Sequence, residues 1–229
     1  CLLLLCIFVH FTAYAPGLPE GMIAIDDEEL TQIPQIQTPP TPQSLKSIWT
    51  VGSHIDFYPL RDMSYLIDTH ILGNTTLSYR THQFILFYFC VFFIYILLQQ
   101  LGLNNWFSFF ITSFWAFNPY HSEMLMWISA RKDLLAIFYI LLSSLSFMYA
   151  LQRQRLWAHF LCIVFFTASL LSKASFSGLP LALLILFVFH PPLRQQRKVL
   201  IVLSCCVLLG LVSSIFQTWF YSVINDMRF

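Results

Sequence analysis

Charged residues are scarce in this chain. Lys, Arg, Asp and Glu make up 10% of its 229 residues, whereas 58% of the residues are hydrophobic. Soluble domains contain about 25% charged residues, so the composition excludes an ordinary soluble protein and indicates a membrane protein. The formal net charge is +1 and no long basic block is present, which argues against nucleic acid as a partner.

Metal-binding cysteine patterns are also lacking. None of the six cysteines stands at CxxC spacing or at the spacing of His and Cys zinc ligands. The sequence therefore favours neither a zinc site nor a disulfide framework. Most of these cysteines lie inside apolar stretches, which predicts buried and unreactive thiols.

Apolar runs, by contrast, recur along the whole chain. Seven such segments lie at about 1–14, 83–101, 105–118, 134–151, 156–172, 176–190 and 199–217. Several are shorter than the roughly 20 residues of a full span, which tilting or local thinning of the bilayer accommodates. The sequence predicts an all-α polytopic membrane protein, a bundle of about seven spans that forms a single domain over residues 1–229.

The first apolar run has two interpretations. Ala13-Tyr14-Ala15 resembles a signal-peptide cleavage site, but Pro16 would hinder cleavage, which favours a retained membrane helix. After it, residues 15–80 form a long polar loop with prolines at 34, 39, 40 and 42. Within this loop, Ser64 to Leu72 is predicted to form a short surface helix.

Two short basic connectors predict the orientation. Residues 152–155 (QRQR) and 194–198 (RQQRK) lie between apolar segments, and the positive-inside rule places both in the cytoplasm. The loop 15–80, the second loop 119–133, residues 172–176 and the C-terminus then face the other side.

All eleven acidic residues fall on that outer side: Glu20, Asp26, Asp27, Glu28, Glu29, Asp56, Asp62, Asp68, Glu123, Asp133 and Asp226. Acidic residues contribute little to topology, so sidedness does not require this distribution. This distribution indicates an outer surface on which carboxylates have a function. The simpler alternative is that a long loop must be soluble, which would account for Glu20, Glu28, Glu29 and Asp56.

The second outer loop carries the run NPYHSEMLMWISARKD from Asn118 to Asp133. Asn118 and Pro119 are typical of a helix start. On that helix Glu123, Trp127 and Arg131 would share one face, with Arg131 and Lys132 facing water or lipid headgroups. Ordinary interfacial anchoring by cations is the alternative.

Five motifs in this order resemble the GT-C superfamily of integral-membrane glycosyltransferases, in particular the protein O-mannosyltransferase-like branch associated with tetratricopeptide repeats. They are the acidic pair Asp26-Asp27, FYPLRDMSYLID (Phe57 to Asp68), His82 at the start of the second span, NPYHSEMLMWISARKD, and LLSKASFSGLP (Leu170 to Pro180). The resemblance covers nearly the whole chain. It departs from the family pattern at Tyr58, Asn118 and Ala174.

The resemblance implies an inverting transfer of a sugar from a polyprenyl-phosphate donor to a protein or glycan acceptor. An acceptor hydroxyl must lose its proton as it attacks, which requires a carboxylate, and Asp26 and Asp27 are the candidates. Cations would stabilise the leaving phosphate, and the expected ligands are Arg131, Lys132 and Lys173. Four residues are expected to hold the acceptor or support the loop: His121, Glu123, His82 and Asp68.

Further expectations concern cofactors and location. A divalent cation, Mg²⁺ or Mn²⁺, would bind Asp26 and Asp27 if one takes part, and related branches differ in this. The compact loops favour a bacterial inner membrane with the active face in the periplasm, and the endoplasmic reticulum with a lumenal active face is the alternative. A C-terminal repeat region and a larger membrane complex are implied partners, together with membrane lipids.

Two other functions fit parts of the sequence. Tyr58 and Asn118 favour a non-catalytic GT-C-like scaffold that binds lipid or partner helices. A lipid flippase or transporter ranks third, because the charged residues map to helix ends and loops and no inverted repeat is evident.

Overall fold

The computed structural model describes residues 2–18, 21, 25–50, 56–181 and 197–228, and within these ranges the chain is helical and contains no strand. The longer helices are α1 (Leu2–Tyr14), α6 (Thr76–Gln100), α7 (Asn105–Ala116), α9 (Arg131–Arg153), α10 (Leu156–Ser172) and α13 (Arg197–Arg228). The shorter ones are η1 (Ala15–Gly17), α2 (Ile25–Thr31), α3 (Pro34–Gln37), α4 (Pro42–Thr50), α5 (Pro59–Ile67), η2 (Asp68–Leu72), α8 (His121–Met126), η3 (Ile128–Ala130) and η4 (Ala174–Phe176).

Three of the described helices are long and apolar enough to cross a membrane: Thr76–Gln100, Ile128–Arg153 and Lys198–Val223. The apolar helices Leu2–Gly17 and Leu156–Ser172 are shorter. The predicted span at 176–190 falls mostly outside the described residues. The structure thus confirms an all-helical chain with three helices of spanning length, and a bundle of seven spans stays a prediction.

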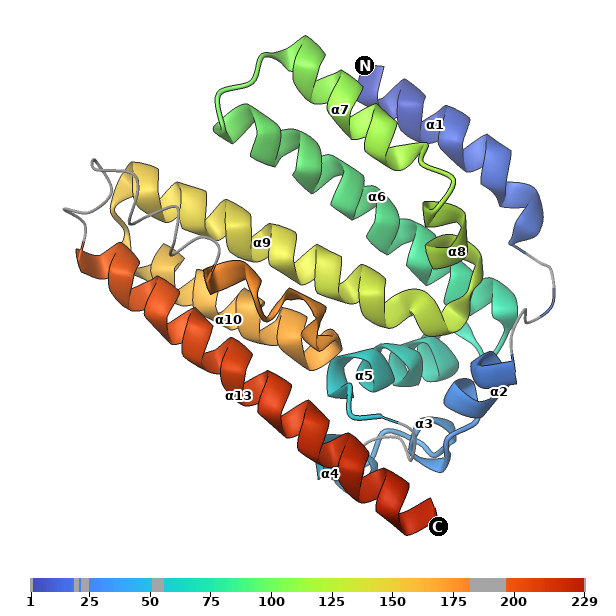
Figure 1. Ribbon diagram of the computed structural model, residues 1–229. Helices are drawn as coiled ribbons and strands as arrows, with labels where there is room; N and C mark the ends of the chain where they lie inside the picture. Colours follow the sequence, from blue (N-terminus) through green and yellow to red (C-terminus); the bar gives the residue numbers. More distant parts are fainter. Residues whose placement is uncertain (1, 19–20, 22–24, 51–55, 182–196, 229) are drawn as a thin grey trace.

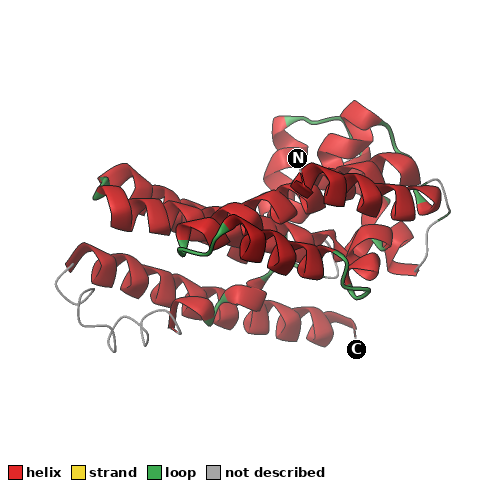
Figure 2. Cartoon of the chain, turned by 90° about the horizontal axis from the view of Figure 1, so that it is seen from above, coloured by secondary structure: helices red, strands yellow, loops and turns green. Residues whose placement is uncertain are grey.

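The long helices lie side by side (Figures 1 and 2). Helix α9 packs between α6 and α10, and α13 packs on the other side of α10. One apolar core joins α1, α6 and α9 around Phe87 and Leu134. A second joins α9, α10 and α13 around Ile140 and Phe166.

Local sequence explains where these helices begin and end. The Thr75 hydroxyl accepts a hydrogen bond from the backbone N–H of Ser78 at the start of α6, and the Asn104 amide oxygen accepts one from Phe107 N–H at the start of α7. Such caps satisfy N–H groups that have no partner within the helix. Between α6 and α7, Gly102 adopts a φ of 90°, a conformation that glycine accommodates without strain.

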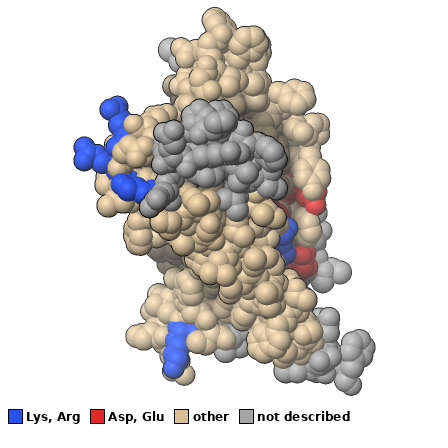
Figure 3. Space-filling view, turned by 60° about the vertical axis from the view of Figure 1, so that its left-hand side comes forward, with Lys and Arg blue, Asp and Glu red and all other residues tan. Residues whose placement is uncertain are grey.

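The two ends of the bundle differ in charge. Arg153, Arg155 and Lys198 are exposed at one end, where Val199 at the start of α13 packs near Leu151 of α9. Figure 3 shows a group of Lys and Arg side chains at the upper left, as expected for the basic connectors, and further Lys and Arg beside Asp and Glu at the right. Residues 194–196 of the second connector lie outside the described range. The short helices α2–α5 lie at the opposite end (Figure 1).

One local prediction is confirmed in part, and another is wrong. Residues 64–72 are helical, in α5 and η2, with Ser64, Tyr65 and Leu66 buried and Ile67, Ile71 and Leu72 exposed, so one face of the segment packs against its neighbours and the other lies on the surface. Also, Asn118 does not start a continuous helix. Its side-chain oxygen accepts a hydrogen bond from Tyr120 N–H in a turn, and α8 begins at His121.

The cysteine prediction holds for most of the described chain. Cys6, Cys90, Cys162 and Cys206 are buried free thiols. Cys205 is exposed on α13, because it points away from the neighbouring helices.

Candidate functional site

Helix α2 brings the acidic pair against the segment that leads into α9. The Asp26 carboxylate accepts a hydrogen bond from Trp127 Nε1 at 3.1 Å, and the Asp27 carboxylate accepts one from the backbone N–H of Ser129 at 2.8 Å. Asp26 is partly exposed, whereas Asp27 is fully buried. The two neighbours therefore lie at the same end of the bundle as Arg131 but in different environments.

Arg131 is fully buried, so the prediction that it faces water or lipid headgroups was wrong. Its guanidinium forms an ion pair with Asp68, donates to the carbonyl of Tyr79 at 2.6 Å, and lies 4.7 Å from the ring centroid of Tyr65. A buried cation without such a partner would cost several kcal/mol. Asp68 supplies that partner from 63 residues earlier in the chain, which explains why sequence position alone did not reveal the burial.

The two lysines are more accessible. The Lys132 ammonium lies 3.7 Å from an Asp56 carboxylate oxygen, and its side chain is 24% exposed. The Lys173 ammonium lies 2.5 Å from an Asp133 carboxylate oxygen, and its side chain is 29% exposed. Both cations therefore have an acidic partner and an open side.

The predicted common face of Glu123, Trp127 and Arg131 is also wrong. Helix α8 ends at Met126, and Trp127 has an extended backbone with φ −86° and ψ 111°. The helical spacing of four residues is lost there. Glu123 is exposed, and it does not share a helix with Arg131.

His121 occupies an aromatic environment. It is largely buried, its ring centroid lies 4.3 Å from that of Trp115, and Phe87 lies at 5.9 Å. Burial lowers the pKa of His121, because desolvation disfavours the charged imidazolium. Neither ring nitrogen forms a hydrogen bond. This placement suits a packing role more than contact with an acceptor.

His82 contacts Asp68 directly. The distance from His82 Nδ1 to Asp68 Oδ1 is 2.6 Å, and Asp68 is fully buried. Asp68 thus bridges His82 on α6 and Arg131 on α9. These three residues and Asp27 all lie close to the start of α9.

Sequence reasoning missed a second buried charge cluster. Arg61 is fully buried and pairs with Asp56 at 2.6 Å and with Asp62 at 2.7 Å. Burial raises the pKa of Asp62 to about 6, although the positive charge of Arg61 opposes this shift. The signal available in the sequence was the adjacent Arg61-Asp62 pair itself, in a chain otherwise short of charge.

Arg80 is another organising residue that the sequence did not single out. Its guanidinium is buried and donates to the carbonyl oxygens of Met126 at 3.0 Å, Gly17 at 2.8 Å and Gly21 at 2.8 Å. It therefore ties the segment after α1 to the end of α8. Its position near the start of an apolar helix was a signal for such a role.

The acidic pair is a weak match for a divalent cation. One oxygen of each carboxylate already accepts a hydrogen bond from an N–H group. Within the described ranges, no three His, Cys, Asp or Glu residues are arranged to hold a metal ion. Mg²⁺ or Mn²⁺ at Asp26 and Asp27 therefore stays a prediction of the resemblance.

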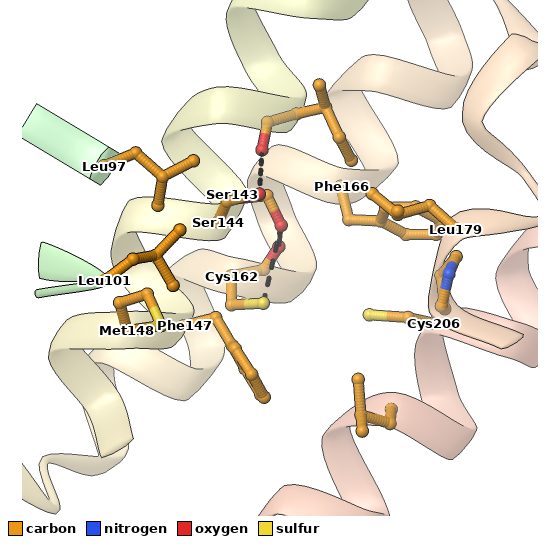
Figure 4. Close-up of a pocket in the computed structure, with 13 residues that line it drawn as sticks. Leu97, Leu101, Ser143, Ser144, Phe147, Met148, Cys162, Phe166, Leu179 and Cys206 are labelled. Atoms are coloured by element: carbon orange, nitrogen blue, oxygen red, sulfur yellow. Dashed lines mark hydrogen bonds between the residues drawn. The ribbon is translucent and has the colours of Figure 1, made fainter. Parts of the chain in front are cut away.

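A cavity of about 210 Å³ lies between α6, α9, α10 and α13, nearer to the basic end (Figure 4). Its polar lining is limited to serine and cysteine: Ser143, Ser144, Cys162 and Cys206. The Ser143 hydroxyl donates to the carbonyl of Cys162 at 2.8 Å. The described residues that line this cavity carry no charge, so it suits an apolar group.

A scan against protein-family models, a search of curated proteins and a search of solved structures each gave no match.

Proposed function

We propose that this protein is a membrane glycosyltransferase that moves a sugar from a polyprenyl-phosphate donor to an acceptor hydroxyl, with inversion at the anomeric carbon. The observation that supports this most is that a partly exposed carboxylate, Asp26, and two partly exposed cations, Lys132 and Lys173, lie at the same end of an apolar helical bundle, around the start of α9. Transfer from a lipid phosphate needs these groups near the membrane surface.

Asp26 is the proposed general base. It is the member of the acidic pair with an accessible side chain, and Trp127 Nε1 fixes one of its oxygens. As the acceptor oxygen bonds to the anomeric carbon, Asp26 takes the hydroxyl proton. Asp27 has a positioning role, because its buried carboxylate fixes the backbone at Ser129, directly before α9.

Lys132 and Lys173 are the proposed ligands of the donor phosphate. As the bond between the anomeric carbon and the phosphate oxygen breaks, its electron pair passes to that oxygen, and nearby ammonium groups stabilise the added charge. Asp56 and Asp133 pair with these lysines. Arg131 stays buried and supports the start of α9, while Glu123, exposed on α8, is proposed to contact the acceptor.

The same proposal includes a cellular setting. The apolar composition and the three helices of spanning length support an integral membrane protein. The bacterial inner membrane with a periplasmic active face is our preferred location, and the lumenal face of the endoplasmic reticulum is the alternative.

The test is transfer of radiolabelled sugar from a panel of polyprenyl-phosphate donors by the purified full-length protein. We expect Asp26→Asn to lower the rate by about 10²- to 10⁴-fold, the usual contribution of a general base, while donor binding persists. Glu28→Gln is the matched control, because Glu28 is an exposed acid on the same helix. Equal rates for the two variants would refute Asp26 as the base.

A non-catalytic scaffold is the second candidate, favoured by one observation. Arg131 is buried and both lysines already have acidic partners, as in a structural network. In this case the protein would bind the donor lipid without transferring sugar, and neither Asp26→Asn nor Asp27→Asn would change that binding.

A further inference from the structure

The contact between His82 and Asp68 fixes the orientation of an imidazole ring. Its Nδ1 atom lies 2.6 Å from Asp68 Oδ1, and the second oxygen of Asp68 pairs with Arg131. A carboxylate is an acceptor, so Nδ1 carries the proton in this contact. Nε2 is then the ring nitrogen that can bind a further group.

That remaining nitrogen is accessible. The His82 side chain is 23% exposed, whereas Asp68 and Arg131 are completely buried. In the described part of the chain, no hydrogen bond to His82 Nε2 is found. The buried pair therefore holds the ring at Nδ1 and leaves Nε2 accessible.

The surroundings of His82 place it at the membrane surface. His82 lies six residues after Thr76, about 9 Å along α6 from its outer end at 1.5 Å per residue. Ile85 on the same helix is 49% exposed, and Ile71, three residues after Asp68, is 74% exposed. Apolar side chains exposed beside a polar edge are typical of headgroup depth.

The charges around the ring permit an anion as its ligand. Arg131 and Asp68 cancel, so the cluster is neutral when His82 is neutral. The other nearby titratable groups are uncharged phenols or point elsewhere: Tyr79 OH bonds to Thr69 and Asn74, and exposed His70 bonds through Nδ1 to the Leu66 carbonyl. An imidazolium would add a positive charge, and a bound phosphate would balance it.

We propose that His82 binds the phosphate of a lipid through Nε2, with Asp68 and Arg131 as positioning residues. The imidazole takes up a proton from solvent as the phosphate binds, and the Nε2–H group donates to a phosphate oxygen. The phosphate belongs either to the polyprenyl donor or to a membrane phospholipid. Only the first of these sources rests on the proposed glycosyltransferase function.

Carbethoxylation of histidine by diethyl pyrocarbonate tests this site. The full chain in a maltoside detergent free of phosphate is treated with the reagent, and modification at each histidine is measured by mass spectrometry. His70 is an internal control, because it is exposed but bonded to a backbone carbonyl. We expect polyprenyl phosphate to slow modification of His82 at least fivefold and to leave His70 unchanged.

Phosphatidic acid identifies the source of the phosphate. Protection of His82 by polyprenyl phosphate alone would assign the donor lipid, and protection by both lipids would assign a general lipid-phosphate site. Protection by neither lipid, or equal protection of His70, would overturn the proposal. If His82 is protected but no sugar is transferred, the proposed glycosyltransferase function fails and the phosphate site remains.

The His82→Asn substitution separates binding from packing. It places an amide N–H where Nδ1 lies and keeps a donor for Asp68, but it lacks Nε2. We expect His82→Asn to keep the thermal midpoint of the wild type and to weaken polyprenyl-phosphate binding about tenfold, the usual scale of a charge-assisted hydrogen bond. Unchanged affinity in a folded His82→Asn protein would contradict the proposal.

Discussion

Helix α9 begins and ends with an arginine, and the two residues lie in opposite environments. Arg131 at its start is fully buried and pairs with Asp68. Arg153 at its end is exposed, next to the connector to α10. The same side chain thus organises a buried network at one end of the bundle and remains in a polar environment at the other. Neighbouring carboxylates, and not residue type, account for the difference.

The same contrast separates the two halves of the molecule. The half of the molecule around α5 and the start of α9 buries Arg61, Arg80 and Arg131 together with their carboxylate or carbonyl partners. In the basic half, the described residues form apolar packing and a cavity whose described lining carries no charge. Buried cations with polar partners therefore distinguish the first half from the second.

The largest effect should come from breaking the buried pair. Asp68→Ala would leave Arg131 buried without its counter-charge, which costs about 3–5 kcal/mol. We expect a large fall in the thermal midpoint of the detergent-solubilised protein. Asp133→Ala is the matched control, since its partner Lys173 is partly exposed. Equal loss of stability in both variants would contradict the comparison.

The pH dependence of stability tests the charge cluster around Arg61. The pKa of Asp62 is about 6 in the folded protein and near 3.8 when the chain is unfolded. Because the folded state binds this proton more tightly, the free energy of unfolding should decrease as the pH rises from about 4 to about 6. Protonated Asp62 contributes roughly 3 kcal/mol to the free energy of unfolding. This contribution is fully present below about pH 4 and is lost by about pH 6.

Thermal unfolding between pH 4 and pH 7.5 checks this slope. Asp62→Asn cannot titrate, so its unfolding should vary less with pH than that of the wild type. Glu123→Gln removes an exposed acid and should leave the slope unchanged. A slope retained in Asp62→Asn would assign the titration to another group.

Shape complementarity in the apolar region can be tested at Gly210 on α13. A Cβ atom there would lie 2.4 Å from the carbonyl oxygen of Ser177. We expect Gly210→Ala to destabilise the protein by about 1–3 kcal/mol, the usual cost of overpacking. Gly178→Ala, where a Cβ meets nothing within 4 Å, is the control and should have little effect on the thermal midpoint.

The smallest effect is expected at the basic end. Arg153→Gln changes an exposed side chain, so the free energy of unfolding should stay within about 0.5 kcal/mol of the wild type. The same thermal-unfolding measurement applies. A loss comparable to that of Asp68→Ala would show that the two ends of α9 depend on charge pairing to a similar extent.

Prediction from the sequence succeeded best for the helices. The apolar segments at 134–151 and 199–217 lie within α9 and α13, and the segment at 83–101 lies within α6 except for its last residue. It failed at the second outer loop, where a continuous helix through Glu123 and Arg131 was expected and Trp127 breaks it. An apolar run can be recognised from the neighbouring residues alone. The extended backbone at Trp127, in contrast, depends on groups that are distant in the sequence, such as Gln83, which donates to the Trp127 carbonyl at 2.9 Å.

For the candidate site, the motif order led to Asp26, Asp27, Asp68, His82 and Arg131 before their contacts were known. It did not separate the partly exposed Asp26 from the buried Asp27. Adjacent residues have the same sequence context, so only the position of Ser129 and Trp127 distinguishes them.

The sequence by itself determined the apolar helices and the basic connectors, because hydrophobic length and local charge are properties of neighbouring residues. Tertiary structure alone decided which charges are buried and which remain accessible. The environment of Arg131 depends on a carboxylate 63 residues away in the chain, and the strength of such a pairing is set by distance and burial in the folded protein.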